Sequence, residues 1–192
     1  SALDQRILVL DGAMGTAIQE KGLSAADFGG PDLEGCNEYL VATRPDIIQE
    51  IHKSYLKAGC DIVETNTFGG TPLVLDEYGL GSKASELNRK AAQLARAAAE
   101  KYSTPQKPRF VAGAIGTTTK AIAVTGGITF SSLQENFYVQ AKALLEGGVD
   151  YFLLETCQDT RNIKAGILAI ERLFSEIGAR IPVAISGTIE AM

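Results

Sequence analysis

The sequence predicts an α/β fold with a parallel sheet, and two observations lead to this expectation. First, short apolar runs alternate with longer stretches of helical period along the whole chain, and such alternation builds βαβ units whose strands run parallel. Second, AGCDIVET at 58–65 resembles GGVDYFLLET at 147–156: each has a glycine, an aspartate, an apolar run and then Glu-Thr. Both a doubly wound sheet and a (β/α)8 barrel fit this pattern. The barrel is favoured, because no predicted strand is followed by the G-x-G-x-x-G of dinucleotide-binding sheets.

Five short apolar runs bounded by turn residues are expected to form the strands. The two copies of the repeated segment differ in length by two residues, which preserves the face to which each side chain points, because strands have a period of two. The predicted strands are 7–11, 61–65, 110–114, 151–156 and 182–186.

Four stretches between these strands carry apolar residues at the i, i+3, i+4, i+7 spacing of a helix. They are 45–58, 84–102, 131–146 and 160–177. Pro45 suits the first position of a helix, and a glycine follows three of the predicted helices as a C-terminal cap, at 59, 147 and 178. Ser131 is expected to cap the start of the third helix.

This count of five strands and four helices is too small for a closed barrel, which needs eight of each and about 250 residues. We therefore expect one domain, residues 1–192, that corresponds to about the first five βα units of a (β/α)8 barrel. The remaining strands would lie outside this sequence or come from another chain, unless the sheet is open.

The composition excludes several classes of protein. The net charge is −5 and no cluster of Lys or Arg is present, which argues against nucleic acid and anionic membranes as partners. No apolar run approaches the roughly 20 residues of a membrane-spanning helix, and the first residues lack a signal-peptide pattern. Cys36, Cys60 and Cys157 are scattered and form no C-x-x-C motif. Three such thiols suit a reducing compartment, so a cytoplasmic protein is expected.

Polar groups end every predicted strand, and in α/β folds the carboxyl ends of the strands carry the functional site. None of these strand ends carries Lys, Arg or His. Carboxylates there would attract an ammonium group, and the glycines would let backbone N–H groups approach a carboxylate. The pattern therefore favours an amino acid as the ligand. The strand-end segments are 11–13, 64–67, 113–118, 155–156 and 186–188.

Each of these polar residues also has a structural interpretation, because acids at strand ends often only fix a turn. Glu64 lies one residue before a Thr-Asn-Thr turn, and we assign it a structural role. His52 is the only histidine and lies within a predicted helix; we expect it on the helix surface, which argues against a Ser-His-Asp or Cys-His mechanism. Cys157 is expected to be a small buried apolar residue, and Cys60 precedes a strand at the opposite, stability face.

Four segments together resemble the homocysteine S-methyltransferase family. They are LDGAMGT at 10–16, AGCDIVETNTF at 58–68, GGVDYFLLET at 147–156 and ISGT at 185–188. The intervening sequence is most similar in style to the N-terminal module of the cobalamin-dependent members, rather than to the shorter relatives that use betaine or no cobalamin. The resemblance covers nearly the whole chain in order.

The resemblance implies a (β/α)8 barrel that binds L-homocysteine. By position, Asp11 and Glu155 resemble the two carboxylates that hold the homocysteine ammonium group. Gly12, Ala13 and Met14 would line the same pocket with their backbone, and so would the turn made by the following residues: Thr65, Asn66 and Thr67.

The resemblance also implies cofactors that these residues do not hold. In the family, zinc binds three cysteines, one after strand six and an adjacent pair near the end of strand eight, and this sequence ends after strand five. Zinc keeps the homocysteine thiol deprotonated and nucleophilic. The methyl group comes from methylcobalamin, ultimately from methyltetrahydrofolate, on further modules of the same polypeptide, and methionine is the product. We expect neither zinc nor cobalamin on this chain alone, no residue of it in a catalytic role, and no methyl transfer by it alone.

Two other interpretations stay open at this point. The parent protein could be a cobalamin-independent methyltransferase that uses betaine or S-methylmethionine. Alternatively, the chain could be a non-catalytic amino-acid-binding module, or a partner that supplies strands to a shared barrel. In each case the first and last strands lose a neighbour, so we expect self-association through the open sheet edges or marginal stability.

Overall fold

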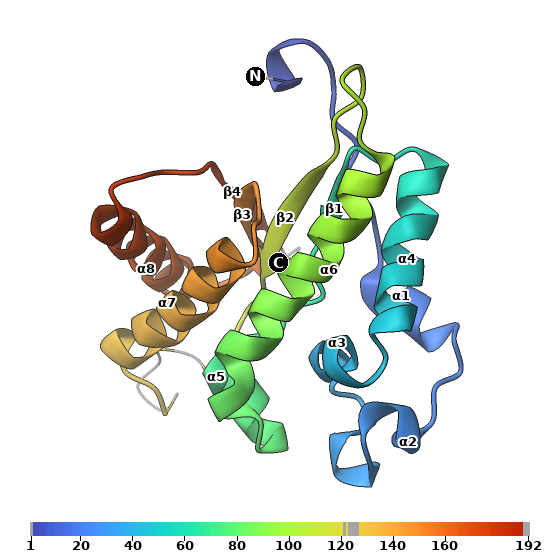
Figure 1. Cartoon of the computed structure of the whole chain (residues 1–192). Coiled ribbons are helices and arrows are strands. Elements are labelled where there is room, and N and C mark those ends of the chain that lie inside the picture. The colour runs from blue at the N-terminus through green and yellow to red at the C-terminus, as the bar shows by residue number, and fades with distance from the viewer. Residues whose placement is uncertain (1, 121, 123–126, 190–192) are drawn as a thin grey trace.

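A four-stranded parallel sheet forms the centre of the protein in a computed structural model that describes residues 2–120, 122 and 127–189 (Figure 1). The strands are paired in chain order, β1-β2-β3-β4, and each pairs in parallel with the next. The prediction of an α/β fold with a parallel sheet is thereby confirmed. The strands are β1 Ile62–Glu64, β2 Phe110–Ile115, β3 Tyr151–Cys157 and β4 Val183–Gly187.

Four long helices cover one face of this sheet (Figure 1). They are α4 Pro45–Ala58, α6 Ala84–Tyr102, α7 Phe130–Glu146 and α8 Thr160–Ile177. Helix α6 packs against β1 and β2, α7 against β2, and α8 against β3. The shorter helices are α1 Met14–Gln19, α2 Ala25–Phe28, α3 Leu40–Thr43 and α5 Pro72–Leu75, and the 3-10 helices are η1 Ala2–Asp4, η2 Pro31–Leu33, η3 Asn37–Tyr39, η4 Asp76–Tyr78 and η5 Gly81–Lys83. No helix among the described residues is long and apolar enough to cross a bilayer.

The ends of the long helices follow the local signals of the sequence, with two differences. Pro45 begins α4, and Gly59 and Gly178 end α4 and α8 in the left-handed conformation, as predicted. Gly147 caps α7 as predicted, but in the right-handed conformation, and the left-handed residue is the next one, Gly148, with φ of 93°. The predicted cap Ser131 is wrong: it lies inside α7, and the hydroxyl of Thr129 instead accepts the N–H of Ser132 at 3.1 Å.

The prediction of a strand at 7–11 is wrong, because this segment forms no regular strand. The segment nevertheless lies beside β1, where the first strand was expected. Only Leu10 forms a bridge, parallel to Ile62, and Val9 accepts two backbone hydrogen bonds from the start of β1. Ile7 and Val9 are 87% and 56% exposed. The segment makes this one bridge and few backbone hydrogen bonds to β1, which are too few for a continuous ladder.

Most apolar side chains are buried between the sheet and the helices. Phe137 of α7, Phe152 of β3 and Ile170 of α8 are among the largest fully buried ones. A second apolar cluster lies between α4, the first half of α6 and the short N-terminal helices. Helix α4 packs against α1, α3, α6 and β1. Its buried face is therefore broad, and His52 is fully buried, so the prediction of a surface histidine is wrong.

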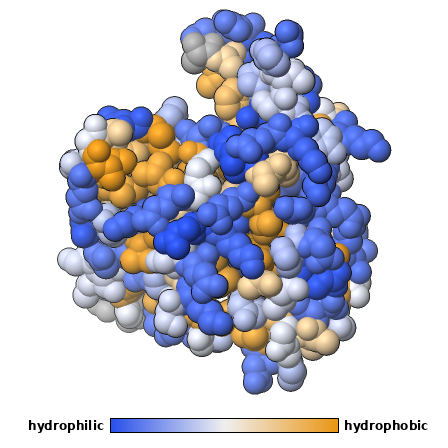
Figure 2. Space-filling model, in the orientation of Figure 1, coloured by the Kyte–Doolittle hydropathy of each residue, from blue (hydrophilic) through white to orange (hydrophobic). Residues whose placement is uncertain are grey.

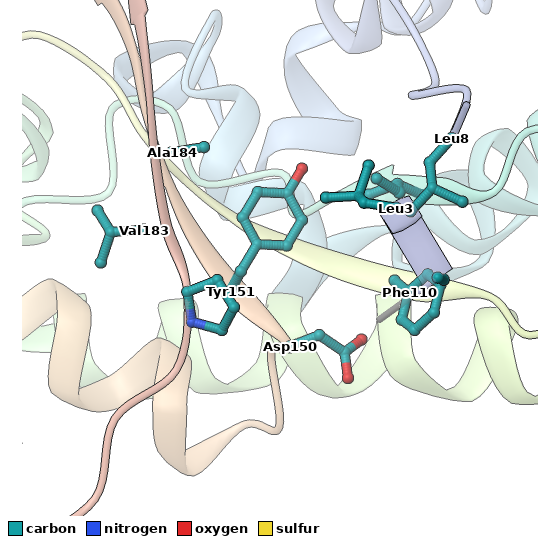
Figure 3. A pocket seen from close by; sticks show the side chains of 10 residues that line it. Leu3, Leu8, Phe110, Asp150, Tyr151, Val183 and Ala184 are labelled. Atoms are coloured by element: carbon teal, nitrogen blue, oxygen red, sulfur yellow. The ribbon is translucent and has the colours of Figure 1, made fainter. Parts of the chain in front are cut away.

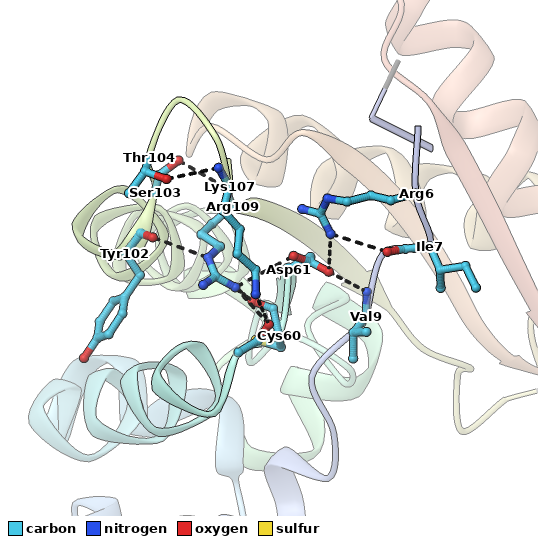
Figure 4. Close-up of polar contacts among 11 residues, drawn as sticks. Arg6, Ile7, Val9, Cys60, Asp61, Tyr102, Ser103, Thr104, Lys107 and Arg109 are labelled. Atoms are coloured by element: carbon cyan, nitrogen blue, oxygen red, sulfur yellow. Dashed lines mark hydrogen bonds and ion pairs between the residues drawn. The ribbon is translucent and has the colours of Figure 1, made fainter. Parts of the chain in front are cut away.

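Asp61 and Asp150, which occupy equivalent places in the repeated segments, make equivalent contacts. Asp61 accepts the N–H of Val9 at 2.9 Å and pairs with Arg6 at 2.8 Å (Figure 4). Asp150 accepts the N–H of Val111 at 2.7 Å and pairs with Arg96. Each aspartate therefore holds the beginning of the neighbouring strand in register, which gives the repeated pattern a structural explanation.

The face of the sheet opposite the helices borders a cavity of about 580 Å³. The ring of Tyr151 projects into it from β3, with Leu3, Leu8 and Phe110 around it (Figure 3). A second apolar area is exposed beside α8 and β4 (Figure 2), where Val183 and Ile185 are 37% and 49% exposed. Both sides of the last strand thus carry uncovered apolar surface.

Candidate active site at the carboxyl ends of the strands

Three carboxylates gather at the carboxyl ends of the first strands. Glu64 is the last residue of β1, Glu155 belongs to β3, and Asp11 follows the Leu10 bridge. Their neighbours Val63 and Leu154 are buried on the helix side of the sheet. Because successive side chains of a strand point to opposite faces, Glu64 and Glu155 point to the other face. The carboxylate of Asp11 accepts the backbone N–H of Glu64 at 3.0 Å. The fold therefore brings together Asp11 and Glu155, as predicted, and adds Glu64.

These carboxylates hold their protons unusually tightly. Burial raises the pKa of Asp11 to about 8, and the charges of Glu64 and Glu155 also raise it. The hydrogen bond from the Glu64 N–H lowers this pKa, but by less than burial raises it. Burial and the charge of Glu155 raise the pKa of Glu64 to about 7, and burial raises the pKa of Glu155. No lysine, arginine or histidine in the described part of the chain forms an ion pair with any of the three. The site is therefore acidic, and no described residue supplies a cation that pairs with these carboxylates.

Tyr151 lies on the same face of β3 and forms part of the surroundings of these acids. Burial raises the pKa of its hydroxyl to about 12, and the charges of Glu64, Asp11 and Glu155 add to this shift. The ionised forms of these three carboxyl groups oppose the loss of the phenol proton, so Tyr151 stays protonated and keeps its capacity to donate a hydrogen bond.

The backbone of β3 is irregular where it carries Glu155. The register of β3 against β4 shifts between Leu154 and Cys157, and Thr156 has φ of 56°, a conformation that β-branched residues rarely adopt. Bulges of this kind re-aim side chains and occur next to functional sites. The irregularity lies directly beside Glu155 at the rim.

The turn Thr65-Asn66-Thr67 is buried and internally hydrogen-bonded. The N–H of Ala114 donates to the Thr65 hydroxyl at 3.0 Å, the Thr65 and Thr67 hydroxyls are 2.6 Å apart, and the Thr67 hydroxyl donates to the Ala114 carbonyl at 2.7 Å. Asn66 donates to the backbone carbonyl of Asn37 at 2.7 Å. These side chains fix the turn at the rim, and their contribution to ligand binding stays a prediction.

Two buried amides that the sequence analysis missed support this turn. Asn88 of α6 donates to the Gly70 carbonyl at 2.6 Å, and Gln140 of α7 donates to the Thr67 carbonyl at 2.7 Å. A Cβ on Gly70 would lie 2.4 Å from Asn88 Oδ1, so this approach requires glycine. In the sequence, each amide lies within the apolar face of a predicted helix. Buried polar side chains need a hydrogen-bond partner, so this position indicates a structural contact.

The segment after Asp11 is more open. Gly12 and Ala13 are exposed, and Met14 begins α1 and packs partly against the second apolar cluster. The backbone at residues 12–13 therefore faces solvent at the same rim as the carboxylates, which is where the sequence analysis placed it.

The cysteines do not fit a zinc site. Cys36 is buried near η3, Cys60 is buried before β1 at the other end of the strand, and Cys157 is half-buried in β3. Burial raises the pKa of Cys36 and Cys60 to about 11 and also raises that of Cys157, whereas zinc ligands need to lose the proton. The described residues contain no group of three or more His, Cys, Asp or Glu that could hold a metal ion.

Comparisons with known proteins agree with this geometry. The family profile for homocysteine S-methyltransferase matches residues 8–192. Methionine synthase of Mycobacterium leprae is 40% identical over 188 residues, which is 98% of this chain but 15% of that protein. The metallated form of the homocysteine methyltransferase MmuM from Escherichia coli has a TM-score of 0.78 at 25% identity, and the match covers 98% of this chain and 66% of that one.

The oxidized form of MmuM gives a TM-score of 0.77 at 26% identity over 64% of its chain. The chain thus spans less than two thirds of these solved structures and a small part of the longer relative. The profile nevertheless covers residues 8–192, which include Asp11, Glu64 and Glu155, and the structural match covers 98% of this chain. The chain belongs to the homocysteine S-methyltransferase family.

Proposed function

We propose that this chain is the N-terminal part of the homocysteine-binding domain of a cobalamin-dependent methionine synthase. The 40% identity to a methionine synthase over 98% of the chain, against 25–26% to the homocysteine methyltransferase MmuM, supports this choice over the other members of the family. Residues 1–192 would then supply the first strands of a (β/α)8 barrel. Strands six to eight, with the zinc cysteines, would come from sequence beyond them.

The observation that carries the proposal is the acidic cluster without a cation at the rim of the sheet. Asp11 and Glu155 would bind the ammonium group of L-homocysteine, since a buried cation needs opposite charges close by. The backbone around Gly12, Ala13 and Met14, together with the Thr65–Thr67 turn, would line the pocket beside the carboxylate of the ligand. In this proposal, Asp11 follows an apolar segment because that position places its carboxylate where it binds the amino group of the ligand.

Methyl transfer would take place in the whole protein. There the methyl group would move from methylcobalamin, ultimately from methyltetrahydrofolate, to the sulfur of homocysteine, and methionine would result. The residues present here do not fit zinc, and we assign zinc and cobalamin to other parts of the polypeptide. The partners of this chain would be homocysteine and the downstream folate- and cobalamin-binding modules. Three free thiols suit a cytoplasmic location.

The first test is homocysteine binding by the Asp11→Asn variant of the natural full-length protein that carries these residues. The amide keeps the shape of Asp11 and can accept the Glu64 N–H, but it removes the charge that faces the ammonium group. We expect affinity to fall at least tenfold, about 1.4 kcal/mol, in isothermal titration calorimetry at pH 8. Asp32→Asn is the matched control, because Asp32 is exposed in η2. Equal affinities for Asp11→Asn and the wild type would contradict the proposal.

A further inference from the structure

We propose that Gln140 of α7 is a positioning residue for the amino-acid site. From the helix layer it fixes the Thr65-Asn66-Thr67 turn in the place that homocysteine binding requires. This inference rests on the proposed function, in which that turn lines the pocket. It goes beyond that function because it gives a role in ligand binding to a helix residue that is itself fully buried.

The side chains of this turn are already used in bonds to neighbouring backbone. The Thr65 hydroxyl accepts the N–H of Ala114 at 3.0 Å, and the Thr67 hydroxyl donates to the Ala114 carbonyl at 2.7 Å. The side-chain amide of Asn66 donates to the carbonyl of Asn37 at 2.7 Å, and all three turn residues are buried. The turn therefore acts on a ligand mainly through its backbone, so the position of that backbone decides the fit.

Gln140 reaches this backbone from the helix side. Its Nε2 donates to the Thr67 carbonyl at 2.7 Å and to the Ala114 carbonyl at 3.4 Å. One amide thus joins α7 both to the turn and to β2. Both neighbours are acceptors, so the NH2 group of the amide faces them, because the opposite orientation would set oxygen against oxygen.

The chain comes very close to this amide at Gly70. A Cβ on Gly70 would lie 2.8 Å from Gln140 Nε2 and 2.9 Å from the Thr67 carbonyl oxygen, so a side chain there would push the turn and the amide apart. The N–H of Gly70 donates to the Thr67 carbonyl at 3.0 Å. That bond lies within the turn and does not fix the turn relative to the helices, whereas the bond from Gln140 does.

Stability alone does not account for an amide at this position of α7. Gln140 lies on the same side of the helix as Phe137 and Leu144, three residues before it and four after it, and both belong to the main apolar cluster. Gln140 Oε1 is buried and has no hydrogen-bond partner among the described residues. A buried amide oxygen without a partner destabilises the folded state, and an apolar side chain of the same length would avoid this penalty.

The two carbonyls that Gln140 contacts would also keep a donor without it. The Thr67 carbonyl would retain the N–H of Gly70, and the Ala114 carbonyl would retain the Thr67 hydroxyl. Loss of the amide therefore leaves no new unpaired backbone group. It removes only the tie between α7 and the turn.

Asn88 of α6, the other buried amide at this turn, differs in this respect. Its Nδ2 donates to the Gly70 carbonyl at 2.6 Å, and no other described residue donates to that buried carbonyl. Loss of Asn88 would leave this acceptor unpaired, which destabilises a protein. Asn88→Leu is therefore expected to lower the melting temperature, and it serves as the structural reference for Gln140.

The experiment compares homocysteine affinity and thermal stability for the Gln140→Met variant of the natural full-length protein that carries these residues. Methionine keeps the length of the side chain and cannot donate to Thr67. We expect homocysteine to bind about tenfold more weakly in isothermal titration calorimetry, since small displacements of a site cost binding and rate. The melting temperature should equal that of the wild type or exceed it. Gln93→Met is the matched control, because Gln93 is exposed on α6, and it should change neither quantity.

The outcomes separate this inference from the proposed function. If Gln140→Met binds homocysteine as tightly as the wild type, Gln140 does not position the site, although the proposed function stands. If the variant loses affinity and also melts at a lower temperature, as expected for Asn88→Leu, the role of Gln140 is structural and the inference is overturned. If the wild type does not bind homocysteine, the proposed function fails and this inference fails with it.

Discussion

Burial shifts two ionisable residues of this chain in opposite directions, and the reason is the charge that each would carry. Asp11 would be negative and its pKa rises to about 8, whereas His52 would be positive and burial lowers its pKa to about 4. In both cases the neutral form is favoured, because the interior solvates charge poorly. Asp11 lies at the rim where a ligand can neutralise it. His52 lies inside, and neither of its ring nitrogens has a hydrogen-bond partner among the described residues.

His52 should make the protein sensitive to acid. Between pH 6.5 and about 4 the unfolded chain takes up a proton that the folded histidine does not, so stability is lost as the pH falls through this window and no further below it. The total loss is about 3 kcal/mol, since one pKa unit corresponds to about 1.4 kcal/mol. The His52→Leu variant removes this dependence. Urea unfolding at pH 7 and pH 4 should therefore show the difference between variant and wild type growing by about that amount, and a constant difference would refute the assignment.

The strands of this sheet are aligned by side chains as well as by the backbone ladder. Asp61 and Asp150 each hold the N–H of a neighbouring strand, and Asn88 and Gln140 hold the turn that follows β1. Strand β3 is the element in which this order is interrupted, at Thr156. The interruption lies next to Glu155. We therefore interpret the positive φ of Thr156 as backbone strain that is retained because it serves the candidate site.

Replacing Thr156 by glycine tests that interpretation at the level of the strand. Thr156 is exposed, so glycine loses little packing, and it adopts a positive φ without the clash of a Cβ. We expect Thr156→Gly to raise the free energy of unfolding by about 1 kcal/mol, or the melting temperature by about 2–4 °C, in calorimetry. Thr156→Ala keeps a Cβ and should gain less than half of this. A loss of stability in the glycine variant would show that the threonine is not strained.

At the scale of the whole molecule, apolar surface remains uncovered at both sides of the sheet. Ile7 and Val9 are exposed beside β1. Strand β4 pairs only with β3 in the described part of the chain, and its residues Val183 and Ile185 are partly exposed. The area beside α8 and β4 is apolar in Figure 2. Open strand edges with apolar side chains favour pairing with another chain.

We therefore predict that the 192-residue chain associates with itself in solution. Sedimentation velocity at increasing concentration should show species larger than the monomer of 20.3 kDa. Ile185→Lys places a charge at the edge of β4 and should reduce this association. Leu168→Lys is the control, because Leu168 is 39% exposed on α8 rather than on a strand. A single monomer at all concentrations, with a sharp and cooperative melt, would contradict the prediction.

Local features of the sequence were enough to place the long elements. The four helices match their predicted ranges to within a residue, because apolar period and caps such as Pro45 and Gly59 are encoded by neighbours in the chain. The position of Asp11 and Glu155 at one rim also followed, since parallel strands place their carboxyl ends together. The irregular segment at 7–11 and the cap at Thr129 did not follow, because each depends on which hydrogen bonds the folded backbone offers.

The sequence by itself determined the order of strands and helices, the parallel sheet, the family resemblance and the acids at the strand ends. Only the tertiary structure decided that Glu64 joins Asp11 and Glu155, that His52 is buried, and that Asn88 and Gln140 support the rim. The physical reason is that burial and the distance between charges depend on contacts between residues far apart in the chain. Asp11 and Glu64 are separated by 53 positions and meet through one hydrogen bond, which no local pattern encodes.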